Sequence, residues 1–180
     1  MRRPAVRRPT RDTPTRLVLA AAMAIAPSWP AATGAAPPPP SASPPPRLAV
    51  GDTVPALGVI GLDGAEKRIS FPEKGATVLL FFMSSCPTCH RMIPEWNRAF
   101  ERRPPSVQVV GVLLDREPPG FFMATSISFP VVRPASRDSV RTQYRVNHVP
   151  LTLRLGAGGQ VQDLAQGQID GIRLGELFRP

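Results

Sequence analysis

Thr77-Val-Leu-Leu-Phe-Phe-Met-Ser-Ser-Cys86-Pro-Thr-Cys89-His-Arg-Met-Ile-Pro94 is the stretch that decides the fold. Its first half is an apolar run rich in Val, Leu and Phe, which predicts a buried strand. Pro87 suits the first position of a helix, where its missing N–H costs nothing. The sequence therefore predicts a strand that passes directly into a helix, with Cys86 at the junction.

Both cysteines of the chain lie at this junction. Unpaired N–H groups and the helix dipole favour an anion at a helix N-terminus, and at Cys86 that anion is a thiolate. Cys89 lies one helical turn further along the same face and is placed to form a disulfide with Cys86. Because so short a loop removes little chain entropy, the pair is better explained as a redox dithiol than as a structural clip.

The first 46 residues differ in composition from the rest of the chain. Six arginines precede the apolar run 17–26, and small residues crowd positions 31–36, which is typical of an export signal. That run spans only about half of a bilayer core, which argues against a stable membrane anchor. Seven prolines in residues 37–46 predict an extended spacer.

We therefore expect a signal peptide over residues 1–36, a Pro-rich linker over 37–46 and one folded domain over 47–180. A disordered Arg/Ala/Pro tail is the alternative for the first segment. Export would place the cysteines in a periplasmic or other extracytoplasmic compartment, where disulfides persist. An uncleaved N-terminus would hold the domain at the membrane.

The charge of the chain is concentrated at its N-terminus. The net charge is +9, and residues 1–36 contribute +5 from six Arg and one Asp. The remaining +4 is dispersed, without a basic stripe of interleaved aromatic residues. The composition therefore argues against nucleic-acid binding.

The predicted elements follow the order β-hairpin, β-α-β, helices, β-hairpin and helix. The expected strands cover 54–60, 67–70, 77–82, 107–114, an edge-like segment at 129–132, 151–155 and 161–165. The expected helices cover 87–103, 121–126, 136–144 and 169–178. A helix between two apolar strands supplies the crossover that parallel strands need. The order predicts an α/β domain with a mixed sheet.

With this motif and this order, residues 47–180 resemble the thioredoxin superfamily, and more narrowly the exported thioredoxin-like (TlpA/ResA, redoxin) proteins. The resemblance implies a central mixed β-sheet flanked by helices, with an N-terminal β-hairpin extension. The residues that carry it are the strand with Cys86-Pro-Thr-Cys89 and Pro94, together with Val50-Gly-Asp-Thr-Val-Pro55, Phe129-Pro-Val-Val132, Tyr144-Arg-Val, Val149-Pro150 and Gly159-Gln-Val.

The resemblance implies a thiol–disulfide oxidoreductase with Cys86 as nucleophile and Cys89 as resolving cysteine. It also implies that Val149-Pro150 is a cis peptide, which offers backbone groups to an extended partner chain. Relatives of this type are usually reductants, often serve cytochrome c maturation and are recharged by a membrane electron donor. We expect protein thiol and disulfide substrates, a monomer, no cofactor and no metal.

The sequence departs from the relatives' pattern at two positions. An acidic or amide residue is common six before the first cysteine, where Leu80 stands, and a Glu two before the helix proline, where Met92 stands. Both groups are thought to help move the proton of Cys89. We expect water to do so here, with Glu95 as the candidate side chain. Met83 stands where peroxidase-type redoxins have Thr or Ser, which argues against a peroxidase.

Two alternatives to a redox dithiol start from the same cysteines. Cys86-Pro-Thr-Cys89-His90 matches the attachment signature of c-type haem, with His90 as axial ligand. The buried Phe-rich strand before it argues against haem, because the motif needs a suitable structural context. Alternatively, both thiolates and His148 could bind copper as soft ligands.

Overall fold

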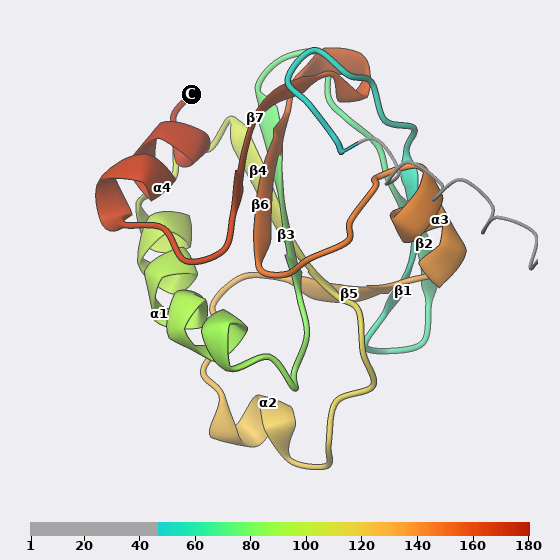
Figure 1. The fold of residues 1–180 in the computed structure, drawn as a ribbon, viewed down its shortest axis with the longest axis vertical. Coiled ribbons are helices and arrows are strands. Elements are labelled where there is room, and N and C mark those ends of the chain that lie inside the picture. The colour runs from blue at the N-terminus through green and yellow to red at the C-terminus, as the bar shows by residue number, and fades with distance from the viewer. Residues whose placement is uncertain (1–46) are drawn as a thin grey trace, which may run out of the picture. The chain divides into compact units, whose positions relative to one another are not determined.

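The computed structural model describes residues 47–180, in which a mixed sheet is flanked by helices (Figure 1). The predictions made for residues 1–46 lie outside the described residues. The strands are β1 (Leu57–Gly61), β2 (Glu66–Ile69), β3 (Ala76–Phe82), β4 (Val107–Leu113), β5 (Val131–Pro134), β6 (Leu151–Leu155) and β7 (Val161–Gln166). The helices are α1 (Pro87–Arg102), α2 (Phe121–Ala124), α3 (Arg137–Thr142) and α4 (Gly171–Phe178), with a 3-10 turn at Ala157–Gly159.

The seven strands form one sheet in the order β2-β1-β5-β4-β3-β6-β7. β3 pairs in parallel with β4, and α1 makes the crossover between them. β4 also pairs in parallel with β5, whereas β1–β2, β1–β5, β3–β6 and β6–β7 are antiparallel. The predicted thioredoxin-like α/β fold, with a mixed sheet and an N-terminal β-hairpin, is confirmed.

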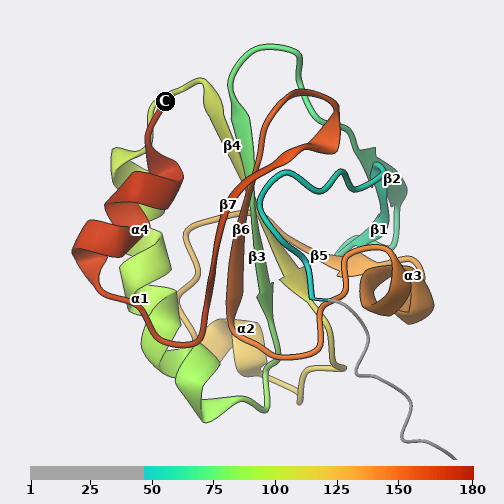
Figure 2. The same cartoon turned by 45° about the horizontal axis from the view of Figure 1, so that its top comes forward.

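The two faces of β3 pack into different cores. Val78, Leu80 and Phe82 face the core beneath α1 and α4. Leu79 and Phe81 face the core that α3 helps to cover. Figures 1 and 2 show α1 and α4 on one side of the sheet and α3 on the other. Because both faces are covered, every residue of β3 is buried, which explains the unbroken apolar run.

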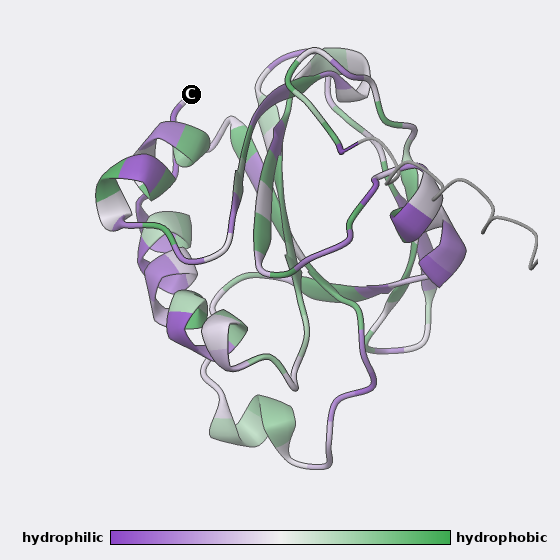
Figure 3. Ribbon diagram, in the orientation of Figure 1, coloured by the Kyte–Doolittle hydropathy of each residue, from purple (hydrophilic) through white to green (hydrophobic). Residues whose placement is uncertain are grey.

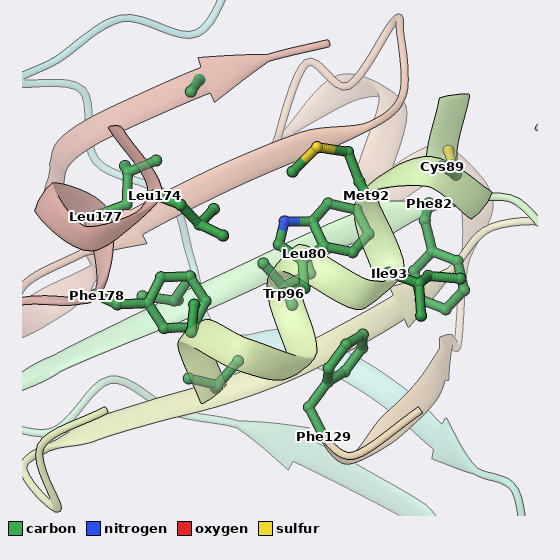
Figure 4. Close-up of a cluster of buried hydrophobic side chains, with 14 of the residues drawn as sticks. Leu80, Phe82, Cys89, Met92, Ile93, Trp96, Phe129, Leu174, Leu177 and Phe178 are labelled. Atoms are coloured by element: carbon green, nitrogen blue, oxygen red, sulfur yellow. The ribbon is translucent and has the colours of Figure 1, made fainter. Parts of the chain in front are cut away.

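Hydrophobic residues follow the central strands, and α3 is largely hydrophilic on its outer side (Figure 3). The buried side of α1 presents Cys89, Met92, Ile93, Trp96 and Ala99 at helical spacing. Trp96 lies at the centre of this cluster, with Leu174, Leu177 and Phe178 of α4 nearby (Figure 4). This packing holds α1, and with it the cysteine motif, against the sheet.

Three segments quoted for the family resemblance meet on the α3 side of the sheet. The Tyr144 hydroxyl donates a hydrogen bond to the Pro55 carbonyl oxygen. Arg145 forms an ion pair with Asp52 at 2.9 Å. The Gly51 amide donates to the Val161 carbonyl oxygen at 2.8 Å. Hydrogen bonds and an ion pair therefore join the first residues of the domain to segments about ninety or more residues later in the sequence.

The expectation of an edge-like segment at 129–132 is wrong. The strand there is β5, which lies inside the sheet between β1 and β4. Pro130 precedes the strand and Pro134 is its last residue, and neither has an N–H to donate to a strand ladder. The Pro130 carbonyl oxygen nevertheless accepts from the Gly111 amide at 2.8 Å. This hydrogen bond joins the residue before β5 to β4, next to the Gly111–Val131 and Val112–Val132 pairs of the parallel ladder.

Within residues 47–180, none of the helices has both the length and the apolar character needed to cross a bilayer.

Candidate redox site

Cys86 caps the N-terminus of α1, directly after β3 and a short loop. Pro87 occupies the first turn, as predicted. The Cys86 Sγ accepts a hydrogen bond from the Cys89 amide at 3.2 Å, and the Cys86 amide donates to the Met83 carbonyl oxygen at 3.2 Å. An amide donor at the N-terminus of α1 therefore points at the sulfur of Cys86.

Cys89 lies one turn further along α1 and is fully buried, whereas Cys86 is half-buried. Both are free thiols in this structure. Burial, together with a hydrogen bond to Cys86, raises the pKa of Cys89 to about 12. The geometry thus separates an accessible sulfur at the helix end from a buried sulfur that is held as a thiol.

The Val149–Pro150 peptide bond is cis, as the resemblance implied. The Cys86 thiol donates to the Val149 carbonyl oxygen, with 3.9 Å between sulfur and oxygen. On the other side, the Pro150 carbonyl oxygen accepts from the Gly167 amide at 2.8 Å. The fold therefore brings Val149 and Pro150, more than sixty residues away in sequence, next to Cys86.

Asp115 is a residue of this site that the sequence analysis did not single out. It follows the end of β4 and accepts three hydrogen bonds from the loop before Cys86. The donors are the Ser84 amide at 2.7 Å, the Ser84 hydroxyl at 2.9 Å and the Ser85 amide at 3.0 Å. Burial alone would raise the pKa of Asp115, but these hydrogen bonds outweigh it and lower the pKa below its usual value.

A sequence signal for Asp115 does exist. β3 and β4 are parallel neighbours, so their carboxyl ends meet at one edge of the sheet, where α/β proteins commonly form their sites. An acidic residue shortly after the end of β4 is therefore a candidate neighbour of a motif shortly after the end of β3.

His90 is used within the fold. Its Nε2 donates to the Ser84 carbonyl oxygen at 2.7 Å, and its ring meets the Phe121 ring edge-on, with 5.8 Å between centroids. The Ser84 backbone is thus held on its amide side by Asp115 and on its carbonyl side by His90.

The comparisons with known proteins agree with this geometry, although no protein-family model matches the chain. It is 28% identical over 116 residues to sporulation thiol-disulfide oxidoreductase A of Bacillus subtilis, a match that covers 60% of this chain and 70% of the relative. The chain has the thioredoxin-like fold and is similar in sequence to a thiol–disulfide oxidoreductase.

Two solved structures show the same fold. StoA from Bacillus subtilis superposes with a TM-score of 0.59 at 22% identity, covering 70% of this chain and 98% of StoA. A secreted Mycobacterium tuberculosis disulfide oxidoreductase, homologous to Escherichia coli DsbE, superposes with a TM-score of 0.56 at 19% identity. That match covers 67% of this chain and 92% of the other protein.

The two departures from the relatives' pattern leave apolar residues beneath the cysteines of this thioredoxin-like protein. Leu80 and Met92 are both fully buried. Glu95 pairs with Arg98 and lines a hollow between α1 and α4 that contains neither cysteine. The structure therefore does not support Glu95 as the proton acceptor of Cys89.

The copper alternative requires His148 as a third ligand beside the two thiolates. His148 lines a cavity of about 490 Å³ that contains neither cysteine. Across residues 47–180, no three Cys, His, Asp or Glu side chains form a group that could hold a metal ion. The expectation that His148 could join the two thiolates is therefore not supported.

The haem alternative is also disfavoured by the position of the sulfurs. Covalent attachment needs both cysteines and the histidine to face one open surface, whereas Cys89 is fully buried. His90 directs its Nε2 to the Ser84 carbonyl oxygen. Neither group is free for a haem without unfolding the first turn of α1.

Cys89 leads to a prediction for the reduced protein at alkaline pH. Burial and Cys86 raise its pKa from 9.0 to about 12, so the folded state favours the neutral thiol. Such a group contributes its full stabilisation below its unfolded pKa and loses it as the pH rises towards the folded pKa. We expect the free energy of unfolding of the reduced protein to fall above pH 9, by about 1 kcal/mol at pH ~10.

Urea unfolding at a series of pH values measures this fall, and the disulfide form is the matched control. The oxidised protein has no thiol to ionise but keeps every other titrating group, including buried Tyr144. Its stability should fall less over the same range. Equal losses in both redox forms would show that Cys89 is not the group responsible.

Proposed function

We propose that the chain is an exported thiol–disulfide oxidoreductase that exchanges disulfides with partner proteins through Cys86 and Cys89, acting as a reductase. One observation carries this proposal. A half-buried sulfur caps a helix N-terminus beside the Val149 carbonyl, and a second sulfur is buried one turn behind it. These are the positions that an attacking thiolate and a resolving thiol require.

In the reductive direction the Cys86 thiolate attacks one sulfur of a partner disulfide. The partner S–S bond breaks, a mixed disulfide forms and one partner thiolate leaves. Cys89 then loses its proton and attacks the Cys86 sulfur, which releases the second partner thiolate. The two leaving thiolates take up protons, so two electrons pass to the partner and Cys86–Cys89 is left oxidised.

The buried Cys89 has a consequence for the second step. Because its pKa is high, only a small fraction is thiolate at neutral pH. Formation of the mixed disulfide removes the negative charge of Cys86, which eases the ionisation of Cys89 at the moment when it is needed. In this scheme water receives the proton, because Leu80 and Met92 offer no side-chain base.

Val149 and Pro150 are the proposed substrate-binding residues. They lie beside the accessible sulfur and precede β6, so an extended partner segment could run along this backbone with its cysteine opposite Cys86. Pairing through main-chain groups would recognise many sequences, which suits an enzyme that acts on several protein disulfides.

The direction and the partners rest on the resemblance. We propose a monomer that is recharged by a membrane electron donor and serves cytochrome c maturation. The redox state in the exporting host tests the direction. Cells quenched in acid are treated with a maleimide reagent that adds mass to each free thiol, with Cys86→Ala as the one-thiol standard. A reductase should be recovered mainly as the dithiol, and a predominantly oxidised protein would indicate a disulfide donor instead.

The proposed division of the chain leads to a further prediction. If residues 1–36 are an export signal and 37–46 a spacer, a chain starting at Arg47 should fold and retain full activity. Circular dichroism and the rate of insulin-disulfide reduction measure both properties against the longer protein starting at Pro37. A chain from Arg47 that remains unfolded while the longer one folds would refute the boundary.

A further inference from the structure

We propose that Asp115 is a positioning residue of the redox centre, which fixes the loop that carries Cys86 and places a negative charge within electrostatic reach of Cys89. The proposal rests on the proposed function for its meaning in catalysis. Its physical content concerns the two thiols and can be measured without any partner protein.

The first part of the argument is geometric. Asp115 comes from the end of β4, thirty residues after the loop that it binds. Its two carboxylate oxygens accept hydrogen bonds from the Ser84 amide, the Ser84 hydroxyl and the Ser85 amide at 2.7–3.0 Å, which are distances typical of well-formed hydrogen bonds. Ser84 is buried, so its amide and hydroxyl would lack partners without the carboxylate.

The second part concerns the position of Cys86. Ser85 is the residue before Cys86, so the carboxylate restrains the backbone immediately before the helix cap. His90 holds the same loop from the other side through the Ser84 carbonyl oxygen. The loop between β3 and α1 is therefore tied to β4 and to α1 at once, which limits the movement of the Cys86 sulfur relative to Val149.

The third part is electrostatic. Cys89 experiences the charges of Cys86 and Asp115, both of which oppose its ionisation. His90, the next residue on α1, directs its ring to the Ser84 carbonyl oxygen. Because its pKa is lowered, the Asp115 side chain is ionised at neutral pH in both redox states of the cysteine pair. Its removal should lower the pKa of Cys89 and so raise the thiolate fraction of Cys89 at alkaline pH.

The test compares Asp115→Asn with Asp115→Glu in the full-length protein. Asparagine keeps an acceptor for the loop but removes the charge, whereas glutamate keeps the charge. For Asp115→Asn we expect about a threefold rise in the Cys89 thiolate fraction at a given alkaline pH, measured by thiolate absorbance in the Cys86→Ala background. Asp115→Glu should retain the wild-type titration of Cys89.

A merely structural role would destabilise both variants and leave the Cys89 titration unchanged, which would overturn the electrostatic part. If Asp115→Asn fails to fold, amide hydrogen exchange in the wild-type protein still tests the clamp. Ser84 and Ser85 must exchange slowly, and free exchange would refute it. If the wild-type protein does not reduce insulin, that result counts against the proposed function. The Cys89 titration and the amide exchange of Ser84 and Ser85 would still test the role of Asp115.

Discussion

Replacement of Cys86 by serine should abolish the reduction of insulin disulfides. We expect the catalysed rate to fall by at least about a thousandfold, so that only the background rate measured without the protein remains. Serine fills the same position at the start of α1 and remains a good helix cap, so the fold should be retained. It cannot act as the attacking thiolate, because its hydroxyl is not ionised at neutral pH. The turbidity of precipitating insulin B chain in the presence of dithiothreitol measures the rate.

Replacement of Cys89 by alanine is the matched control, because it removes the other sulfur of the same motif. Cys86 can then still attack, but the mixed disulfide has no resolving thiol. Cys89→Ala should therefore accumulate covalent adducts with substrate proteins on non-reducing gels, and Cys86→Ser should not. Adducts formed equally by both variants, or full activity of Cys86→Ser, would contradict the assignment of the nucleophile.

Replacement of Trp96 by alanine should have the largest effect on stability. Trp96 is fully buried, and its ring lies against Phe82 and Phe129 in the core between α1 and the sheet. Its Nε1 donates to the Thr152 hydroxyl on β6 at 3.0 Å. Loss of the side chain leaves a large cavity, and we expect a destabilisation of about 3–5 kcal/mol. Because domains are stable by only about 5–15 kcal/mol, much of the variant should be unfolded at 37 °C.

Trp96→Phe separates packing from the hydrogen bond. Phenylalanine fills most of the volume but leaves Thr152 without its indole partner, so we expect a loss of only about 1–2 kcal/mol. Urea unfolding followed by circular dichroism ranks the three proteins. An alanine variant as stable as the phenylalanine variant would show that α1 is not held by this core, and the account of how the cysteines are positioned would fail.

The strand-to-helix junction at Cys86 could be predicted from the sequence because its signals are local. The apolar run before Met83 reflects a strand that is covered on both faces, and Pro87 marks the first turn of the helix. Both features depend on residues within one short stretch. The same holds for the Ser136 cap of α3, which accepts from the Ser139 amide.

The features that the sequence did not show depend on distant segments. The short β5 pairs with β1 and β4, and nothing within its four residues specifies either partner. The role of Asp115 depends on the parallel register of β3 and β4, which brings the ends of both strands to one edge of the sheet. The cis form of Val149–Pro150 came from the family resemblance, because most X-Pro bonds are trans.

Arg154 shows the same limit. It lies within the apolar strand β6 and is buried, and the hydrogen-bond partners of its guanidinium come from other segments of the chain. Its guanidinium donates to the Gln162 side chain and to the Leu177 carbonyl oxygen at 3.0 Å each. The C-terminal end of α4 thus accepts a cation, as helix C-termini favour. Only the tertiary structure places that helix end above β6.

The reduction potential of the Cys86–Cys89 pair tests the central claim most directly. Purified protein is equilibrated in dithiothreitol or glutathione redox buffers, and its free thiols are counted by alkylation and mass spectrometry. We predict a single two-electron transition with a strongly reducing midpoint, below about −200 mV. A midpoint near about −120 mV, where strong oxidants lie, would contradict the reductase assignment. The absence of any reversible dithiol–disulfide transition would contradict the account of the site as a whole.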